Sequence, residues 1–332
     1  MISWPKQNST GVTEFIILGF PSLPEMRVIL FTIFLVIYIL TITANLVIIA
    51  LVKTDAHLHT PMYFFLSNLS FLEISYVSTT VPKMLVSFLS VNNVISFLGC
   101  IIQLLVFSVL GATENFLLAL MAYDRYLAIC NPLHYTTIMN HTTCAHLVVG
   151  AWFAGLFVAS LPCILVSRLT FCGPNIIDHF LCESAPLIKL ACSDTSTSEI
   201  ILSLSASSAT LGSLVFTMGT YICIISTIIR IPSATGRQKA FSTCVSHLTV
   251  VTIFYTTVCV MYVRPSGDDP YKNKLVAVFY GIVTPFLNPF IYSLRNKDVK
   301  EACRRALKRN RALPKNTGAL NVIHCKIGCW NK

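Results

Sequence analysis

Long apolar runs without a charged residue follow one another along most of the chain, with short polar segments between them. Uninterrupted uncharged runs cover Val28–Val52, Ile200–Ile229, Ala240–Val263 and Leu275–Leu294. A helix needs roughly 20 apolar residues to cross the hydrocarbon core of a membrane, whereas a barrel strand needs only about ten. Because these runs are too long for barrel strands, we predict that each is a membrane-spanning helix.

Three more spans come from less regular runs. Tyr126–Ser167 lacks charge but has a polar section in its middle, which leaves one span before that section and one after it. The first runs from about Cys100 to Tyr126, and the second lies near Leu147–Val166. Pro61–Pro82 is interrupted only by Glu73. The pattern therefore predicts an all-α membrane protein, a bundle of seven transmembrane helices.

The composition fits a protein that lies in a membrane. The chain has 332 residues, of which 55% are hydrophobic and 11% are charged, against about 25% charged residues in a soluble domain. An odd number of spans places the termini on opposite sides, and Lys and Arg favour the cytoplasmic side. The stretch from Arg295 onward is rich in both. We therefore expect a plasma-membrane protein with an extracellular N-terminus (1–27), a transmembrane domain (28–294) and a cytoplasmic segment (295–332).

The positive charge concentrates near the C-terminus. The net charge of +10 is largely an effect of this segment, which indicates contact with anionic membrane lipids rather than with nucleic acid. Within Arg295–Arg309, apolar residues recur at helical spacing with Lys and Arg between them. This pattern predicts a short amphipathic helix after the seventh span, lying on the inner membrane surface. A solvated basic tail is the alternative interpretation.

Several features fall on the predicted outer side. Asn8 begins an Asn-Ser-Thr glycosylation sequon. The apolar run Phe15–Phe20 is shorter than a cleavable signal peptide needs. Of the 13 cysteines, those on this side are Cys100, Cys172, Cys182 and Cys192. An even number of extracellular cysteines indicates two disulfides, and the sequence alone allows three pairings.

Polar side chains stand inside four of the predicted spans. Glu73 and Glu114 lie midway in the second and third spans, and Asn45 and Asn288 lie in the first and seventh. Such groups are costly in a membrane, so each is a candidate functional residue. Two buried acids could share a cation or a proton. We predict a polar cluster that can hold a sodium ion, with hydrogen bonding of neutral acids to neighbouring helices as the alternative.

Several motifs in order resemble one receptor family. The DRY that ends MAYDRY (Met121–Tyr126), with NPFIY (Asn288–Tyr292) in the seventh span, resembles the rhodopsin-like G-protein-coupled receptors. MAYDRY itself, PMYFFLSNLS (Pro61–Ser70) and KAFSTCVSHL (Lys239–Leu248) are more specific and look like the vertebrate odorant (olfactory) receptors. The resemblance covers about residues 8–310. One such motif would be weak, but several at the right spans are specific.

The resemblance implies an odorant receptor that activates a stimulatory, olfactory-type heterotrimeric G protein and raises cyclic AMP. It implies that Asp124 holds Arg125 in the resting state. On activation the sixth span would swing outward, and Arg125 would help form the floor of a cavity for the G protein. An arginine at a dry boundary is costly unless paired or solvated, so two such arrangements make a switch. The coupling and switch residues are then Asp124, Arg125, Tyr126, Tyr221, Lys239, Asn288, Pro289 and Tyr292.

The resemblance also implies how the outer cysteines pair. It implies the bridges Cys100–Cys182 and Cys172–Cys192. His179, Cys182 and Glu183 have a spacing that suits metal ligands, but a disulfide at Cys182 removes the thiolate that such a site needs. We therefore predict no metal centre and, apart from a structural sodium ion, no cofactor.

A ligand pocket is expected in the outer half of the bundle. The expected lining is Phe107, Ser108, Gly111 and Ala112 on the third span, Leu202, Ser205, Ala206 and Ala209 on the fifth, Val258 and Tyr262 on the sixth, and Val278 and Gly281 on the seventh. A small apolar lining with a few hydroxyls suits small volatile, neutral molecules bound by shape and one or two hydrogen bonds. The absence of a carboxylate near Phe107 argues against a cationic amine.

Two positions in the spans depart from the family pattern. The first span has Ala44 before Asn45 where the family usually has Gly, and the sixth has Thr256 where it commonly has Gly.

A secondary transporter would show inverted repeats, which we do not find. An intramembrane enzyme would need a catalytic constellation, and neither H-E-x-x-H nor G-x-S-x-G occurs. We predict a receptor and not an enzyme, with a non-olfactory chemosensing receptor of the same fold as the alternative.

Overall fold

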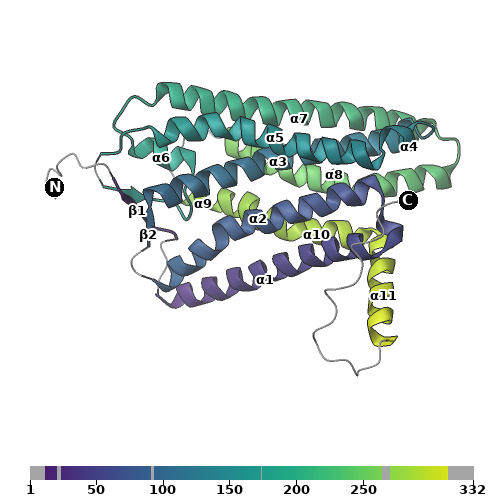
Figure 1. The fold of residues 1–332 in the computed structure, drawn as a ribbon, viewed down its shortest axis with the longest axis horizontal. Helices are drawn as coiled ribbons and strands as arrows, with labels where there is room; N and C mark the ends of the chain where they lie inside the picture. Colours follow the sequence, from purple (N-terminus) through teal and green to yellow (C-terminus); the bar gives the residue numbers. More distant parts are fainter. Residues whose placement is uncertain (1–11, 21–23, 91–92, 173, 264–269, 313–332) are drawn as a thin grey trace.

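The computed structural model describes residues 12–20, 24–90, 93–172, 174–263 and 270–312. Within these ranges the chain forms a bundle of long helices that run along one axis (Figure 1). The long helices are α1 (Pro24–Thr54), α2 (Pro61–Leu89), α3 (Phe97–Cys130), α5 (His141–Ser167), α7 (Ser196–Arg230), α8 (Ala234–Val263) and a last helix made of α9 (Pro270–Val278), the π-helical turn η2 (Phe279–Val283) and α10 (Thr284–Arg295). The predicted seven-helix membrane bundle is confirmed.

Most of these helices extend beyond the apolar runs that predict them. For example, α1 begins at Pro24 and ends at Thr54, while the uncharged run is Val28–Val52. The reason is that a helix satisfies its own backbone hydrogen bonds, so it need not end where the hydrocarbon ends. Local capping contributes to where helices begin. The Ser96 side chain accepts from the backbone N of Gly99 (3.1 Å) at the start of α3.

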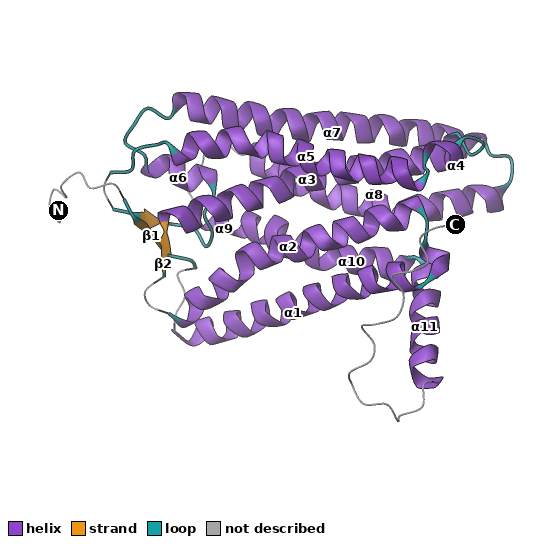
Figure 2. Ribbon diagram, in the orientation of Figure 1, coloured by secondary structure: helices purple, strands orange, loops and turns teal. Residues whose placement is uncertain are grey.

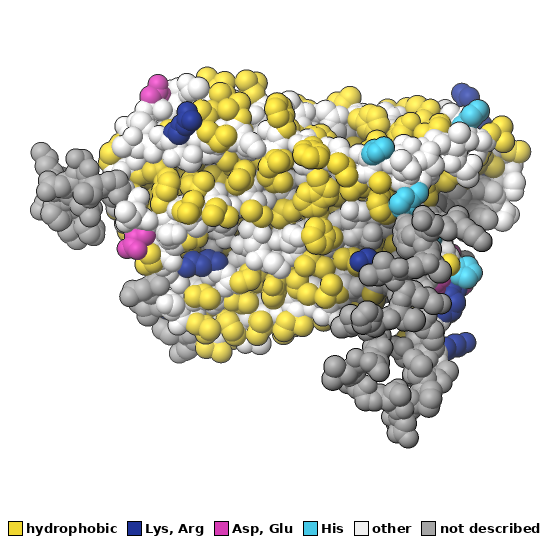
Figure 3. Space-filling view, in the orientation of Figure 1, with side chains coloured by type: hydrophobic (Ala, Val, Ile, Leu, Met, Phe, Trp, Pro, Cys, Tyr) yellow, Lys and Arg dark blue, Asp and Glu magenta, His cyan; other side chains and the backbone are white. Residues whose placement is uncertain are grey.

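The composition of the helices matches a membrane setting. Five helical segments are long and apolar enough to cross a bilayer, and α8 makes a sixth if its two parts, which meet at 43°, count as one span. Helix α2 is less apolar because it carries Asn68, Glu73 and many Ser and Thr residues. On the face shown in Figure 3, hydrophobic side chains are spread along the length of the bundle, and most charged ones lie toward its two ends. The chain is therefore a multi-pass membrane protein.

Helix α3 lies in the middle of the bundle. It packs against α2, α5, α7 and α8. Its sequence suits that place, because its buried positions include Glu114, Asn115 and Asp124 along with the apolar residues. Polar groups on a central helix can find partners on several neighbouring helices, whereas on an outer helix they would face lipid. Both the predicted switch and one of the predicted acids are thus positioned by α3.

One end of the bundle carries a small sheet (Figure 2). Its strands are β1 (Glu14–Ile17), β2 (Val94–Ser96) and β3 (Ile176–Ile177), in the order β2-β1-β3. Strand β1 is antiparallel to β2 and parallel to β3. Phe15 and Ile17 point inward and are buried, as the alternation of a strand requires. Sequence analysis missed this sheet because its strands are too short to show a periodic pattern.

The opposite end carries short elements that join the helices. These are η1 (Ala56–Leu58), α4 (Tyr135–Ile138) and the amphipathic helix α11 (Lys297–Ala312), while α6 (Ser184–Leu190) lies toward the sheet. Helix α11 turns away steeply from the bundle axis (Figure 1). The predicted amphipathic helix is present, with its start and end displaced by two and three residues from Arg295–Arg309. We call the two ends of the molecule the sheet end and the α11 end.

Candidate functional site

A charged pair near the α11 end holds the predicted switch. The Arg125 Nε donates to Asp124 Oδ2 (2.9 Å), and Arg125 Nη2 contacts the same oxygen. The other oxygen, Asp124 Oδ1, accepts from the Tyr135 hydroxyl of α4 (2.8 Å). Asp124 is fully buried, while the Arg125 side chain is 12% exposed. Both carboxylate oxygens are therefore occupied, and the guanidinium is held back against its own helix.

Tyr135 was not predicted from the sequence as a member of this group of Asp124, Arg125 and Tyr135, which we call the lock. It lies outside the spans, five residues past Cys130, where α3 ends. Burial, together with the neighbouring Asp124 charge, raises the pKa of Tyr135, so its hydroxyl keeps the proton that it donates. A tyrosine in a short polar segment carries no distinctive sequence signal. Its role emerges only from the way α4 folds back beneath α3.

A second contact joins α7 to α8 close to the lock. The Tyr221 hydroxyl and His247 Nδ1 are 2.6 Å apart, and both side chains are buried. Tyr221 was predicted as a switch residue, whereas His247 was predicted only as part of the KAFSTCVSHL motif. The signal that could have identified it is an ionisable residue within an apolar run. This hydrogen bond ties the middle of α8 to the bundle in the described structure.

The remaining predicted switch residues lie in the same region. Tyr126 is half-buried and its ring stacks on Tyr123, with centroids 6.3 Å apart. Tyr292 is buried, and its hydroxyl has no hydrogen-bond partner among the described residues. Pro289 is an interior residue of α10. The side chain of Lys239 lies outside the described residues, although its backbone belongs to α8.

The predicted polar cluster comes together in the middle of the bundle. Asn288 Nδ2 donates to Glu73 Oε1 (2.5 Å), and both Asn45 and Glu114 lie close enough to Glu73 to interact with it electrostatically or by hydrogen bonding. Four different helices contribute these side chains. Within the described part of the chain, Asn45 Oδ1, Glu114 Oε1 and Asn288 Oδ1 are buried without a hydrogen-bond partner. Buried oxygens of this kind require a proton, a water or a cation nearby.

The predicted ligand pocket has an aromatic centre. The Phe107 ring lies 4.6 Å from that of Tyr76 and 5.7 Å from that of Tyr280, measured between centroids. A Cβ placed on Gly281 would lie 4.0 Å from Phe107, and one on Gly111 would lie 3.5 Å from the Tyr76 hydroxyl. A Cβ at either position would therefore make only ordinary van der Waals contact with these rings. Tyr76 and Tyr280 were not among the predicted residues.

The other predicted pocket residues are spread over several surroundings. Ser108 contacts Cys163 of α5, and Leu202 packs against the buried cluster at the sheet end. Val258 and Val278 pack against the main core. Ala209 is buried, while the half-buried residues are Ala112, Ser205 and Ala206. The side chain of Tyr262 lies outside the described residues. Membership of the pocket thus stays a prediction, with Phe107 and Gly281 the pair that lie together.

Two disulfides anchor the segment between α5 and α7. Cys100 bonds Cys182, with Cα atoms 5.4 Å apart, and Cys172 bonds Cys192, with Cα atoms 5.7 Å apart. The pairing implied by the resemblance is the one observed. Gln103 Oε1 also accepts from the Cys182 backbone N (3.0 Å). Because Cys182 is in a disulfide, it cannot serve as a metal ligand, and the described residues contain no metal-binding cluster of His, Cys, Asp or Glu.

The same segment is fastened to the last helix by polar contacts, which we call the latch (Asp178, His179, Glu183, Lys274 and Tyr280). Lys274 Nζ lies 2.5 Å from Asp178 Oδ1, and the Tyr280 hydroxyl donates to Glu183 Oε1 (2.9 Å). His179 Nε2 lies 3.5 Å from Glu183 Oε2. Burial lowers the pKa of His179 despite the nearby Glu183 charge. Through Tyr280, the latch reaches the ring of Phe107.

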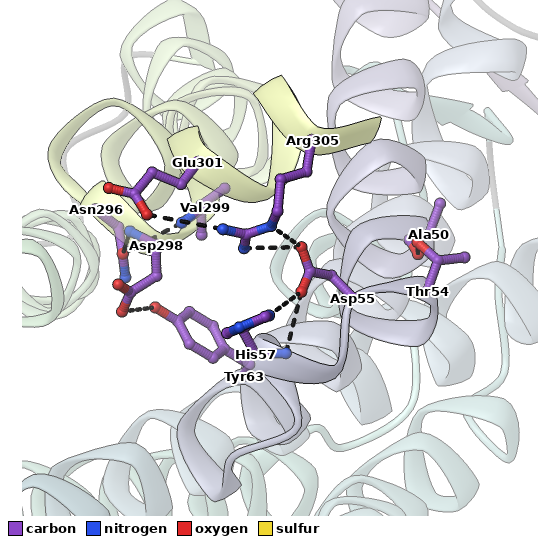
Figure 4. A network of polar contacts seen from close by, with 10 residues as sticks. All are labelled: Ala50, Thr54, Asp55, His57, Tyr63, Asn296, Asp298, Val299, Glu301 and Arg305. Carbon is purple, nitrogen blue, oxygen red and sulfur yellow. Dashed lines mark hydrogen bonds and ion pairs between the residues drawn. The ribbon is translucent and has the colours of Figure 1, made fainter. Parts of the chain in front are cut away.

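A polar network fixes α11 to the turn between α1 and α2 (Figure 4). Arg305 donates through Nε and Nη2 to Asp55 Oδ2, each at 2.8 Å. The hydrogen bond from Arg305 lowers the pKa of Asp55 to about 2. The Tyr63 hydroxyl donates to Asp298 Oδ2 (3.0 Å). Val299 and Ala302 of α11 are buried, so this helix has one face packed on the bundle.

The predicted N-glycosylation site at Asn8 lies outside the described residues. The sequon therefore stays a prediction. The first described part of the N-terminal segment leads directly into β1, which lies at the sheet end. Both disulfides lie toward this end as well. Cys100 and Cys182 belong to the buried cluster that includes Phe15, and Cys172 follows Phe171, whose ring centroid lies 5.3 Å from that of Phe15.

Comparison with known proteins gives a consistent result. A family model described as olfactory receptor matches residues 34–310. Human olfactory receptor 6B1 is 53% identical over 300 residues, which cover 90% of this chain and 96% of that protein. Human olfactory receptor 11L1 is 52% identical over 304 residues, covering 91% and 94%. Squid rhodopsin matches in structure with a TM-score of 0.68 at 17% identity, over 86% of this chain and 81% of that chain. This last likeness shows the fold alone.

Proposed function

Because the chain belongs to the olfactory receptor family, we propose that it detects small volatile, neutral molecules and activates a stimulatory, olfactory-type heterotrimeric G protein, raising cyclic AMP. The family consists of signalling receptors rather than enzymes, so the predicted receptor class is confirmed and a transporter is set aside. The finer points concern the ligand, the G protein and the membrane orientation.

The orientation that we propose places the sheet end outside the cell and the α11 end inside. Two disulfides at the sheet end suit an oxidising compartment. The basic residues of α11 suit the cytoplasmic side and its anionic lipids. The plasma membrane is the location at which such a receptor meets an external ligand.

The observation that carries the proposed coupling is the lock formed by Asp124, Arg125 and Tyr135. A buried carboxylate with both oxygens engaged holds an arginine that is itself mostly buried. This is a resting arrangement in which the cation does not face an intracellular partner. A partner that draws Arg125 away must supply alternative contacts to the guanidinium, since an unpaired buried charge costs several kcal/mol, roughly 3–5. A G-protein helix entering beneath α3 would supply them.

Ligand binding would act on this lock through α8 and the last helix. The predicted pocket is apolar around Phe107, which favours recognition by shape with few hydrogen bonds. Tyr221 and His247 connect α7 and α8 between the pocket and the lock. A ligand that binds one arrangement of α8 more tightly shifts the population toward it. The ligand therefore needs no direct contact with Arg125.

We propose further that the polar cluster holds a sodium ion in the resting state. The unpartnered oxygens of Asn45, Glu114 and Asn288 beside Glu73 are the kind of ligands that a hard cation prefers. Two acids in one buried site would repel each other if both were charged, and a cation relieves that repulsion. These side chains would hold the ion and position the four helices around it.

The proposed function is tested in cells that express the chain and are challenged with a chemically diverse odorant panel while cyclic AMP is recorded. We expect a response to a subset of neutral odorants that Arg125→Ala abolishes at equal surface expression. Arg168→Ala, at the opposite end of the bundle, is the matched control and should respond like the parent. Full cyclic AMP output from Arg125→Ala, or solute uptake without any second messenger, would contradict the proposal.

A further inference from the structure

A groove of about 640 Å³ lies between α7 and α8, away from the predicted ligand pocket. Its α7 wall includes Leu214 and Met218, and its α8 wall includes Val251, Thr256 and Val260. None of the predicted odorant-contacting residues lines it. Its volume falls within the range of sites that bind small molecules, roughly 300–1,000 Å³. The groove is therefore a second candidate site, separate from the pocket around Phe107.

The groove opens toward the bilayer. Met218 and Val260, one on each wall, are 51% and 43% exposed. Along α8 the lining runs from Leu248 to Val260, which at 1.5 Å per residue spans about 18 Å. That length fits inside a hydrocarbon core of about 30 Å. An occupant must therefore enter sideways from the membrane and must tolerate an apolar environment along its length.

Of the four hydroxyl-bearing residues that line the groove, Tyr221, Thr252 and Tyr255 have their hydroxyls bonded inside the protein, and Thr256 is the fourth. The Tyr255 hydroxyl donates to Ser213 Oγ (2.9 Å), and the Tyr221 hydroxyl is bonded to His247 Nδ1 (2.6 Å). Thr252 Oγ1 donates to the carbonyl of Leu248 (2.7 Å) within its own helix. The walls consequently present mostly hydrocarbon to an occupant. A flexible chain without polar groups matches this surface better than a ligand that needs hydrogen bonds.

We propose that this groove holds one fatty acyl chain of a membrane phospholipid, and that the chain favours the resting position of α8. The buried residues that line the groove include Tyr221 and Tyr255, which also make hydrogen bonds that tie α8 to α7. An acyl chain packed on these rings contacts both walls at once. If α8 swings outward, as the proposed function requires, the walls separate and the chain loses contacts. The bound chain is then a regulatory ligand.

Photo-crosslinking tests the site directly. The full-length receptor is placed in nanodiscs of phosphatidylcholine that carries a diazirine on one acyl chain, and the labelled peptides are mapped by mass spectrometry. We expect labelling at the groove to exceed labelling on the surface of α5 around Phe153 and Phe157, which are exposed and are not among the residues that line this groove. Equal labelling of the two surfaces would overturn the proposal.

A matched pair of variants makes the test specific. Met218→Trp fills the groove, and Val215→Trp places the same indole on the exposed face of α7 three residues earlier. We expect Met218→Trp to lower groove labelling about fivefold, because the indole takes the space of the chain, and Val215→Trp to leave it unchanged. Val260→Trp replaces Met218→Trp if that variant does not fold. Equal labelling in the groove-filling and control variants refutes the site, and labelling by a photoreactive sterol alone refutes the acyl-chain assignment.

Adding nucleotide-free G protein to the same nanodiscs tests whether the bound acyl chain favours the resting position of α8. This question is separate from whether the groove binds the chain at all. We expect groove labelling to fall, and basal cyclic AMP in cells expressing Met218→Trp to differ from that of Val215→Trp. Unchanged labelling with G protein, while groove labelling still depends on Met218, would refute the regulatory role and leave the lipid site standing. A receptor that labels at the groove but never activates a G protein would instead refute the proposed function.

Discussion

Lys274 and Asp178 form an ion pair of unequal burial, with an Nζ to Oδ1 distance of 2.5 Å. The lysine side chain is 2% exposed and the aspartate side chain is 48% exposed. The two partners should therefore differ in what their removal does. Water can solvate Asp178 when Lys274 is absent, whereas Lys274 would remain buried without its counter-charge when Asp178 is absent.

We predict that Asp178→Ala destabilises the receptor more than Lys274→Met does. Leaving the lysine buried and unpaired should cost about 3 kcal/mol, while the apolar methionine should change stability by no more than about 1 kcal/mol. Thermal unfolding of the purified protein in detergent measures both. Equal losses of Tm in the two variants would show that the cost of removing either partner does not depend on this difference in burial.

Acid should loosen the latch through His179. Burial lowers the pKa of this imidazole, an effect helped by Lys274 and opposed by Glu183 and Asp178. The unfolded chain then binds more protons once pH falls below the ordinary histidine pKa of about 6.5, so stability should fall with decreasing pH by at most about 1.4 kcal/mol per unit. We expect Tm between pH 7.5 and 5 to fall less in His179→Gln than in the parent. His59→Gln, an exposed histidine elsewhere, should retain the parental dependence.

Weakening the lock should raise basal signalling. Asp124→Asn removes the charge that holds Arg125, and Tyr135→Phe removes one hydrogen bond to the same carboxylate. We expect a large increase in basal cyclic AMP for the first variant and a smaller one for the second, since one such bond contributes about 1–3 kcal/mol. Basal output is measured at matched surface expression. A Tyr135→Phe variant more active than Asp124→Asn would place the restraint elsewhere.

Sodium should act through Glu114. Glu114→Gln keeps the shape of the side chain but removes its charge, so the proposed ion is held less tightly and the resting state loses its preference for sodium. We expect altered basal cyclic AMP and no sodium dependence of odorant potency across a sodium series at constant ionic strength. Glu199→Gln, at the exposed start of α7, is the control. A sodium dependence that survives in Glu114→Gln would leave only a packing role for this acid.

Docking of α11 on the bundle should depend more on Arg305 than on its neighbour Arg304. Arg305 bonds Asp55 and pairs with Glu301 at 3.7 Å, while Arg304 is exposed on the next position. We predict that Arg305→Ala speeds hydrogen exchange of the α11 amides several-fold, because docking of the helix loses its charged contact, and that Arg304→Ala does so less. Exchange mass spectrometry on the full chain compares them. Identical protection in both variants would mean that packing of Val299 and Ala302 is sufficient.

The helices and the polar cluster could be predicted because membrane burial leaves a strong imprint on sequence. A charge such as Glu73 or Arg125 stands out in an apolar run, and its cost makes a function the natural interpretation. The latch and the sheet left no such imprint. Asp178 and Lys274 are ordinary residues in polar segments, and β1 is four residues long. Their contacts depend on how distant segments meet, which no local pattern encodes.

Pocket residues were harder still, for a geometric reason. Ser108 follows Phe107 directly, yet Ser108 contacts α5 while the Phe107 ring contacts those of Tyr76 and Tyr280. Neighbouring positions on a central helix point about 100° apart, so they can face different helices. A helical-face argument narrows the choice of helix surface, but the packing of six other helices decides which side chain meets a ligand.

The register of the small sheet has a consequence for how the protein is made. Ile16 pairs with Ile176, so the first strand of the chain meets its parallel partner only after α1, α2, α3 and α5 have been synthesised. In the proposed orientation, with the sheet end outside the cell, the N-terminal segment must therefore wait on the translocated side of the membrane while those helices are inserted. A nascent chain that stalls before residue 176 would keep this strand half-paired, with Phe15 and Ile17 open to quality-control factors. Completion of the sheet thus marks, late in biogenesis, that the sheet end of the bundle has been assembled.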